Sequence, residues 1–357
     1  MNKLYQHSVQ LLLQTQAPNG AFPASTVFTV YRYCWLRDGT FIAHALDKSG
    51  EHAAAGRFFQ WVDMAIRKHL AKLNQLFLKH QNGEPIGKDD FLHTRFTLDG
   101  DEGTEEWGNF QLDGYGAYLW GVAEHIRLTG DDSFLMKVHR SIEETIRYLT
   151  TFWHVPNHDC WEEFGDRVHP STLAAVFGGL QAIYRYVPVV QIPRTLSAIR
   201  EALQEHGVQN GRFVKSFGNP SIDANLLWLS VPYKVVPPNG HIMVRTVEEI
   251  EHRLVTGGVH RYPEDSFYGG GAWVLLTAWL GWYYAEAGNL QRAKELLAWV
   301  EAQADDQGNL PEQVQESLFF PEKYQEWVDR WGEPAKPLLW SHAMYLILAK
   351  RLQELAG

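Results

Sequence analysis

The chain has 357 residues, of which 45% are hydrophobic and 13% aromatic, and its formal net charge is −10. Such a composition can bury a large core and excludes a disordered or low-complexity chain. The negative charge, without any clustered run of Lys and Arg, argues against nucleic acid as a partner and favours a neutral or cationic small substrate.

Apolar residues recur at the helical period through most of the chain, as at Leu4, Val9, Leu11 and Leu12, so an all-α protein is predicted. Going along the chain, about twelve helices are expected, each uncertain by a few residues. They lie near residues 2–15, 39–49, 51–80, 113–128, 132–152, 171–186, 194–205, 221–229, 246–254, 271–286, 290–304 and 338–355.

The connections between these helices alternate in length. Short ones follow a helix-ending glycine at Gly50, Gly130 and Gly288. Long ones span 16–38, 81–112, 153–170, 206–220, 255–270 and 305–337. Helix hairpins with short turns place all the long loops at one end, so six hairpins are predicted to form an (α/α)₆ toroid, a single domain over 1–357 with a loop-lined cup. An open helical solenoid is the alternative, and the lack of a fixed repeat favours the closed ring.

No run of about 18 apolar residues is present to span a membrane. The first residues read as a helix rather than a signal-peptide core, and two cysteines, Cys34 and Cys160, are too few for a secreted disulfide framework. A cytoplasmic location is therefore expected, and the oligomeric state stays open.

The long loops carry aromatic, acidic and basic residues in clusters, a combination suited to sugars because aromatic faces stack on pyranose rings while carboxylates and guanidinium groups bind hydroxyls. Two acidic sites lie far apart, at Trp161-Glu162-Glu163 and at Pro311-Glu312-Gln313. A glycosidic bond needs such a pair: one carboxylic acid protonates the leaving oxygen, and in inverting enzymes a second carboxylate activates water on the opposite face.

Two other patterns are weaker. The run Gly269-Gly270-Gly271 has no P-loop lysine, so nucleotide binding is not expected. His154, His158 and His169 could suggest zinc, but Pro156 breaks the helix that would align the first two. We therefore expect no metal and no cofactor.

In their order along the chain, the clusters resemble glycoside hydrolase family 15, the glucoamylase family. The resemblance runs from about residue 30 to 345 and rests on Tyr31-x-Tyr33-x-Trp35-x-Arg37-Asp38, Trp107-Gly108 with Gln111-x-Asp113-Gly114, Trp161-Glu162-Glu163, Arg261-Tyr262-Pro263-Glu264-Asp265, Pro311-Glu312-Gln313 and Trp340-Ser341. It implies an (α/α)₆ barrel that removes glucose from the non-reducing ends of α-glucosides with inversion.

The same resemblance implies roles for individual residues. Glu162 would be the general acid and Glu312 the general base, with Ser341 hydrogen-bonded to the base. Trp161 beside Glu162 could raise the pKa of the acid, whereas Glu312 must stay ionised to accept a proton from water. The remaining substrate-binding residues are expected to hold the terminal glucose, line the pocket or contact the leaving group: Tyr31, Trp35, Arg37, Asp38, Trp107, Trp161, Glu163, Arg261 and Trp340.

The expected function is thus an inverting exo-α-glucosidase acting on short oligosaccharides with α-1,6 or α-1,4 linkages. Because the chain carries neither the preceding β-sandwich domain nor the starch-binding module of some relatives, di- to tetrasaccharides are the expected substrates. The alternatives are a trehalase-like hydrolase, another (α/α)₆ carbohydrate enzyme acting on uronic acids, and a non-catalytic glucan-binding regulatory barrel.

Overall fold

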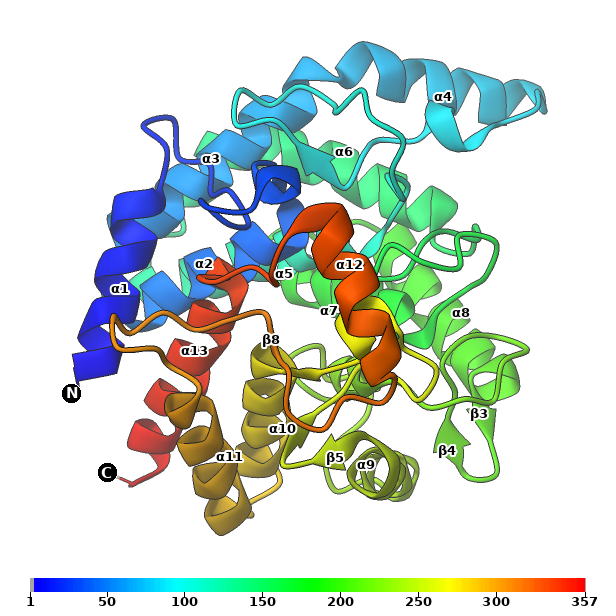
Figure 1. The fold of residues 1–357 in the computed structure, drawn as a ribbon. Coiled ribbons are helices and arrows are strands. Elements are labelled where there is room, and N and C mark those ends of the chain that lie inside the picture. The colour runs from blue at the N-terminus through cyan, green and yellow to red at the C-terminus, as the bar shows by residue number, and fades with distance from the viewer. Residues whose placement is uncertain (1–2, 357) are drawn as a thin grey trace.

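Two concentric layers of helices form a closed ring in the computed structural model, which describes residues 3–356 (Figure 1). In the inner layer each helix packs against the next, and the last packs against the first. The inner helices are α2 (Leu36–Lys48), α5 (Asp113–Thr129), α7 (Pro170–Tyr184), the 3₁₀ helix η3 (Ala224–Leu229), α10 (Val274–Glu286) and α13 (Leu339–Ala356). The contact between α13 and α2 closes the ring, so the predicted toroid is confirmed and the open solenoid is wrong.

The outer layer consists of α1 (Lys3–Thr15), α3 (His52–Lys68), α6 (Phe134–Phe152), α8 (Gln191–His206), α9 (His241–Leu254) and α11 (Leu290–Ala302). An inner helix such as α10 buries nearly every side chain. An outer helix buries one stripe: α8 buries Ile192, Thr195, Ile199 and Leu203, spaced three or four residues apart. No helix within residues 3–356 is both long and apolar enough to cross a membrane.

Short turns lead from inner to outer helices at the three predicted places, after α2, α5 and α10, whereas the longer segment 230–240 leads from η3 to α9. Gly130 and Gly288 take left-handed backbone angles, with φ of 68° and 85°, which end α5 and α10. Asn289 then accepts a hydrogen bond from the backbone N–H of Arg292 and caps α11. The long loops lead back from outer to inner helices, so all six arrive at the N-terminal ends of the inner helices, at one end of the ring.

Three helical predictions need correction. The helix expected over 51–80 is divided at His69, which leaves the helical backbone and bonds the carbonyl of Gly100, so that α3 is followed by a separate α4 (Leu70–Asn82). The segment 221–229 forms the shorter 3₁₀ helix η3 between Pro220 and Pro232. A further helix, α12 (Tyr324–Trp331), lies within the loop expected over 305–337. The expected start of the first helix at residue 2 falls outside the described residues.

The all-α prediction also missed short antiparallel strands that join the loops. β1 (Cys34–Trp35) pairs with β2 (Arg95–Phe96), and β3 (Val208–Gln209) pairs with β4 (Arg212–Phe213). A four-stranded sheet runs in the order β5 (Val255–Thr256), β6 (Gly258–Val259), β7 (Ala272–Trp273) and β8 (Gln313–Val314). Strands of two residues are too short to show the alternation that identifies a strand in a sequence. The smaller helices are η1 (Thr29–Tyr31), η2 (Lys88–Asp90), η4 (Phe267–Gly269) and η5 (Pro321–Lys323).

Candidate active site

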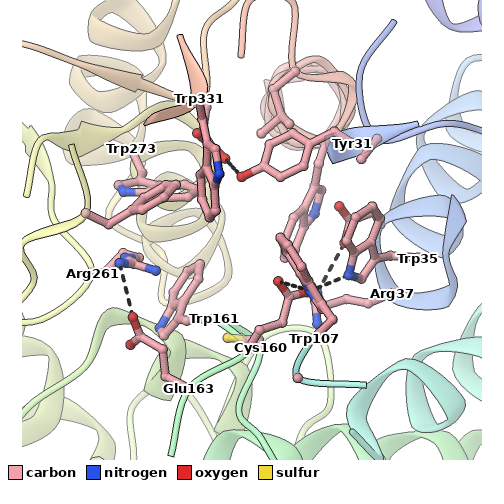
Figure 2. Close-up of a pocket in the computed structure, with 18 of the residues that line it drawn as sticks. Tyr31, Trp35, Arg37, Trp107, Cys160, Trp161, Glu163, Arg261, Trp273 and Trp331 are labelled. Carbon is pink, nitrogen blue, oxygen red and sulfur yellow. Dashed lines mark hydrogen bonds and ion pairs between the residues drawn. The ribbon is translucent and has the colours of Figure 1, made fainter. Parts of the chain in front are cut away.

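A cavity of about 370 Å³ opens at the loop end of the ring (Figure 2). Five of the six long loops contribute to its lining. The cavity brings together eleven of the twelve residues that the sequence singled out: Tyr31, Trp35, Arg37, Asp38, Trp107, Trp161, Glu162, Glu163, Arg261, Glu312 and Trp340. Figure 2 shows Trp35, Trp107 and Arg37 on one side of it and Arg261 and Trp273 on the other.

Glu162 is presented by a tight turn that Asp159 holds. The Asp159 carboxylate accepts hydrogen bonds from the backbone N–H groups of Trp161 and Glu163, at 2.9 and 3.0 Å. Glu162 itself takes the left-handed region, with φ of 68°, which costs a non-glycine residue about 1 kcal/mol or more. The second loop packs tightly behind the turn, since a Cβ on Gly108 would come within 2.8 Å of the Glu162 carbonyl oxygen. Glu162 is therefore held in a fixed, strained position, as is common at active sites.

Both carboxylate oxygens of Glu162 have donors. The indole N–H of Trp35 bonds one oxygen, and that of Trp107 bonds the other at 2.8 Å. Arg37 lies 3.9 Å away. Burial raises the pKa of Glu162, while Arg37 and the two indoles lower it. The raised pKa of Glu162 agrees with the expectation from the sequence, and the neighbouring Trp161 directs its own N–H to Asp223 rather than to Glu162.

Glu312 also lines the cavity and lies directly before β8. The pairing of β8 with β7 fixes it, because Val274 N–H donates to the Glu312 carbonyl at 3.2 Å and the Glu312 N–H donates to the carbonyl of Ala335 at 2.8 Å. The Tyr31 hydroxyl donates to Oε1 of the carboxylate at 2.8 Å, while Oε2 has no partner among the described residues. Oε2 is thus a buried carboxylate oxygen without a hydrogen-bond donor among the described residues.

Burial raises the pKa of Glu312 to about 8, although Tyr31 and Arg261 act to lower it. The sequence argument expected this residue to stay ionised at neutral pH, and the protein environment alone does not achieve that. The physical reason is burial, which Tyr31 and Arg261 oppose at Glu312, whereas Arg37 and two indole N–H groups oppose it at Glu162. A water molecule that donates to Oε2 would favour the ionised form.

Arg37 and Asp38 form the first turn of α2 and are almost fully buried. The Arg37 guanidinium donates to Gln111 and to Asp113 at the start of α5, both at 2.9 Å, and its Nε lies 3.2 Å from Asp38. Burial raises the pKa of Asp38 to about 7, and Arg37 lowers it. The guanidinium also lies 5.1 Å from the ring of Trp340, so this corner joins the first turns of three inner helices.

Arg261 and Glu163 form a second charged pair on the left of Figure 2. Arg261 forms a bidentate ion pair with Asp265, and its guanidinium lies 3.7 Å from the carboxylate of Glu163. The Tyr262 hydroxyl donates to the other oxygen of Glu163. Burial raises the pKa of Glu163 and Arg261 lowers it.

Ser341 lies outside the cavity lining, and its expected bond to the base needs correction. Its hydroxyl donates to the carbonyl of Pro311 at 2.8 Å. Ser341 therefore contacts the backbone next to Glu312 rather than the carboxylate, because the first turn of α13 runs beside the 311–312 segment. It can only position Glu312 indirectly.

Sequence reasoning missed several supporting residues. Arg95 pairs with Trp35 across β1 and β2, and its guanidinium lies 4.3 and 4.4 Å from the rings of Tyr33 and Trp107. Lys215, from the fourth loop, is buried and forms ion pairs with Asp223 and Asp159 behind the Glu162 turn. Neither residue belongs to a recognisable motif. The aromatic residues of α12 could have been found from the sequence, because Trp327 and Trp331 have the spacing of one helical turn.

A closed ring of helix hairpins whose tryptophan-lined cup holds two carboxylates from different loops defines a glycoside hydrolase. The sequence profile of "Glycosyl hydrolases family 15" matches residues 1–350. The chain belongs to that family.

Individual relatives agree with this assignment. An isomaltose glucohydrolase of Kribbella flavida is 41% identical, over 99% of this chain and 93% of its own length. A glycosidase variant solved in complex with glucose is 40% identical, with a TM-score of 0.95 over 98% of this chain and 96% of that one. A trehalase of Sulfolobus acidocaldarius is 27% identical, over 75% of this chain and 48% of its own length. These findings argue against the regulatory barrel and the uronic-acid enzyme.

Proposed function

We propose that this enzyme is an inverting exo-α-glucosidase that releases β-D-glucose from the non-reducing ends of short α-glucosides. The observation that carries the proposal is the pair Glu162 and Glu312, which line one small cavity, with Glu312 almost fully buried and Glu162 partly buried. The base of the cup is lined by Arg37, Asp38 and Trp340, so a chain end rather than a chain interior fits into it.

The terminal glucose would lie against Trp35 and Trp340, with its hydroxyls bound by Arg37 and Asp38. Protonated Glu162 would give its proton to the glycosidic oxygen as the bond to the anomeric carbon breaks. A water molecule that donates to Oε2 of Glu312 would lose a proton to that carboxylate while its oxygen attacks the anomeric carbon from the opposite face. The product has inverted configuration, and both glutamates then exchange protons with solvent.

Several features support further parts of the proposal. The similarity to an isomaltose glucohydrolase favours an α-1,6 linkage over α-1,4. The more distant similarity to trehalases keeps an α,α-1,1 linkage as the second candidate. Two buried, unpaired cysteines agree with a cytoplasmic location. We also propose that residues 1–357 act as one domain, as the continuous hydrophobic core suggests.

The test is a hydrolysis panel of isomaltose, maltose and trehalose at equal concentration, followed by proton NMR. The proposal expects the highest kcat/KM on isomaltose and β-glucose as the first anomer to appear. Initial α-glucose would require a retaining mechanism, and a preference for trehalose would move the enzyme to the second candidate.

A further inference from the structure

Helix α12 lies across the loop end of the ring and forms part of the mouth of the cup. Figure 1 shows it in orange, in front of α7 and the centre of the ring. Trp327, Arg330 and Trp331 of this helix line the cavity, and none of its residues is fully buried. The helix is therefore a surface element whose tryptophans line the cavity and also pack against the edge of the core.

One side of α12 is attached to the fifth loop. The indole N–H of Trp327 donates to the carbonyl of Ser266 at 3.0 Å, and its ring meets Phe267 edge-on with centroids 4.9 Å apart. The Tyr268 hydroxyl donates to the carbonyl of Gly332, just after the helix ends, at 2.8 Å. These contacts hold the helix in place from the side of β7.

The other side of α12 meets the second loop. Trp331 stacks on Trp107, with ring centroids 6.2 Å apart and planes inclined by 26°. Trp107 in turn donates its N–H to Glu162. Because a general acid must reach the glycosidic oxygen, the first sugar of the leaving group lies beside Glu162 and hence along Trp107. A second leaving-group sugar would then meet Trp331 and Arg330.

We propose that α12, through the contact of Trp331 with Trp107, limits the substrate to one leaving-group sugar, so that the enzyme is selective for disaccharides. This inference rests on the proposed α-glucosidase function and adds a chain-length limit to it. Aromatic rings suit the role because they stack on the first leaving-group sugar while their bulk blocks the path of the next one. The exposed guanidinium of Arg330, 4.8 Å from the ring of Trp331, extends the same barrier.

The experiment compares kcat/KM on the α-1,6-linked glucose disaccharide and trisaccharide. The wild-type enzyme should prefer the disaccharide, and Trp331→Ala should reduce that preference by about tenfold or more, the smallest selectivity that a well-placed apolar group commonly provides. Trp331→Phe keeps an aromatic face and should stay close to the wild-type ratio. Trp299→Ala on α11, the same change away from the cavity, is the matched control and should leave the ratio unchanged.

Arg330→Ala provides a second variant that removes only an exposed side chain, so its folding is not in question, and it should shift the ratio in the same direction. Ratios within twofold of wild type for both Trp331→Ala and Arg330→Ala would overturn the chain-length limit, as would equal wild-type activity on both sugars. These outcomes are distinct from failure of the proposed function, which would appear as no glucose from any α-glucoside.

Discussion

The strained electrostatics of Glu312 should be visible in protein stability, independently of catalysis. Burial raises its pKa from 4.5 to about 8, a difference of about 3.5 pH units. Each pH unit of this difference corresponds to about 1.4 kcal/mol, so ionising Glu312 in the folded protein costs up to ~5 kcal/mol more than in the unfolded chain. Water that enters the cup relieves part of this cost, so an effect of about half that size is expected. Glu312→Gln removes the ionisable group and with it the cost.

The sign follows from the raised pKa. Below about pH 4.5 the carboxyl group is protonated in both the folded and the unfolded chain, so the variant gains nothing. Between 4.5 and about 8 the unfolded chain releases a proton that the folded chain keeps, so the stability of the wild type falls relative to the variant. Above about 8 the difference is complete and constant.

The assay is thermal unfolding of both proteins from pH 4 to 9. The Tm of Glu312→Gln should exceed that of wild type by a few degrees at pH 9 and by nothing at pH 4, since ~1 kcal/mol moves the Tm of a chain this size by about 2 °C or less. Glu316→Gln, at an exposed position nearby, is the control, and its Tm difference from wild type should not grow between pH 4 and pH 9. A Tm difference that does not change with pH would refute the buried-carboxylate argument.

Other predictions concern the two glutamates and their support. Glu162→Gln and Glu312→Gln should each lower kcat on isomaltose by at least ~10²-fold, and α-glucosyl fluoride, which needs little protonation, should rescue Glu162→Gln more; the reverse pattern would exchange the two roles. Arg95→Gln should move the alkaline limb of the pH profile of kcat/KM upward, because the charge of Arg95 lowers the pKa of Glu162, while Arg95→Lys should stay near wild type. Lys215→Met should lower the free energy of unfolding by about 3–5 kcal/mol in denaturant titrations, because it leaves Asp223 as an uncompensated buried charge; a loss under about 1 kcal/mol would contradict the pair's structural importance.

The sequence predicted the ring because the alternation of short and long connections survives errors of several residues in each helix. Gly130 and Gly288 mark short turns that are visible locally, and six long loops must then meet at one end. What it could not predict was how the loops are held together. The two-residue strands β7 and β8, which pair Trp273 with Gln313, the residue after Glu312, contain no periodicity to detect.

The cavity residues could be predicted because they belong to motifs that occur in the family's order along the chain. The residues behind them belong to no motif. Lys215 lies in the one long loop that offered no aromatic and charged cluster, yet it is buried behind the Glu162 turn. Arg95 is placed against Trp35 by strand register alone. Such residues become recognisable only once the fold shows which distant segments share a layer behind the cavity.

The same limit explains why the protonation order of the two glutamates escaped the sequence. The neighbour in the chain, Trp161, suggested a raised pKa for Glu162, and burial does raise it. The groups that lower the pKa come from other segments: Arg37, Trp35 and Trp107 for Glu162, and Tyr31 for Glu312. Glu162 accepts hydrogen bonds from two side chains and Glu312 from one, so Oε2 of Glu312 has no donor among the described residues. An attacking water would have to donate to that oxygen. If Glu312 acts as the proposed base, it loses its proton only when the water that attacks the sugar also donates to it. The pH dependence of kcat and that of stability should therefore differ for Glu312, with the catalytic pKa lying below the value of about 8 that governs unfolding.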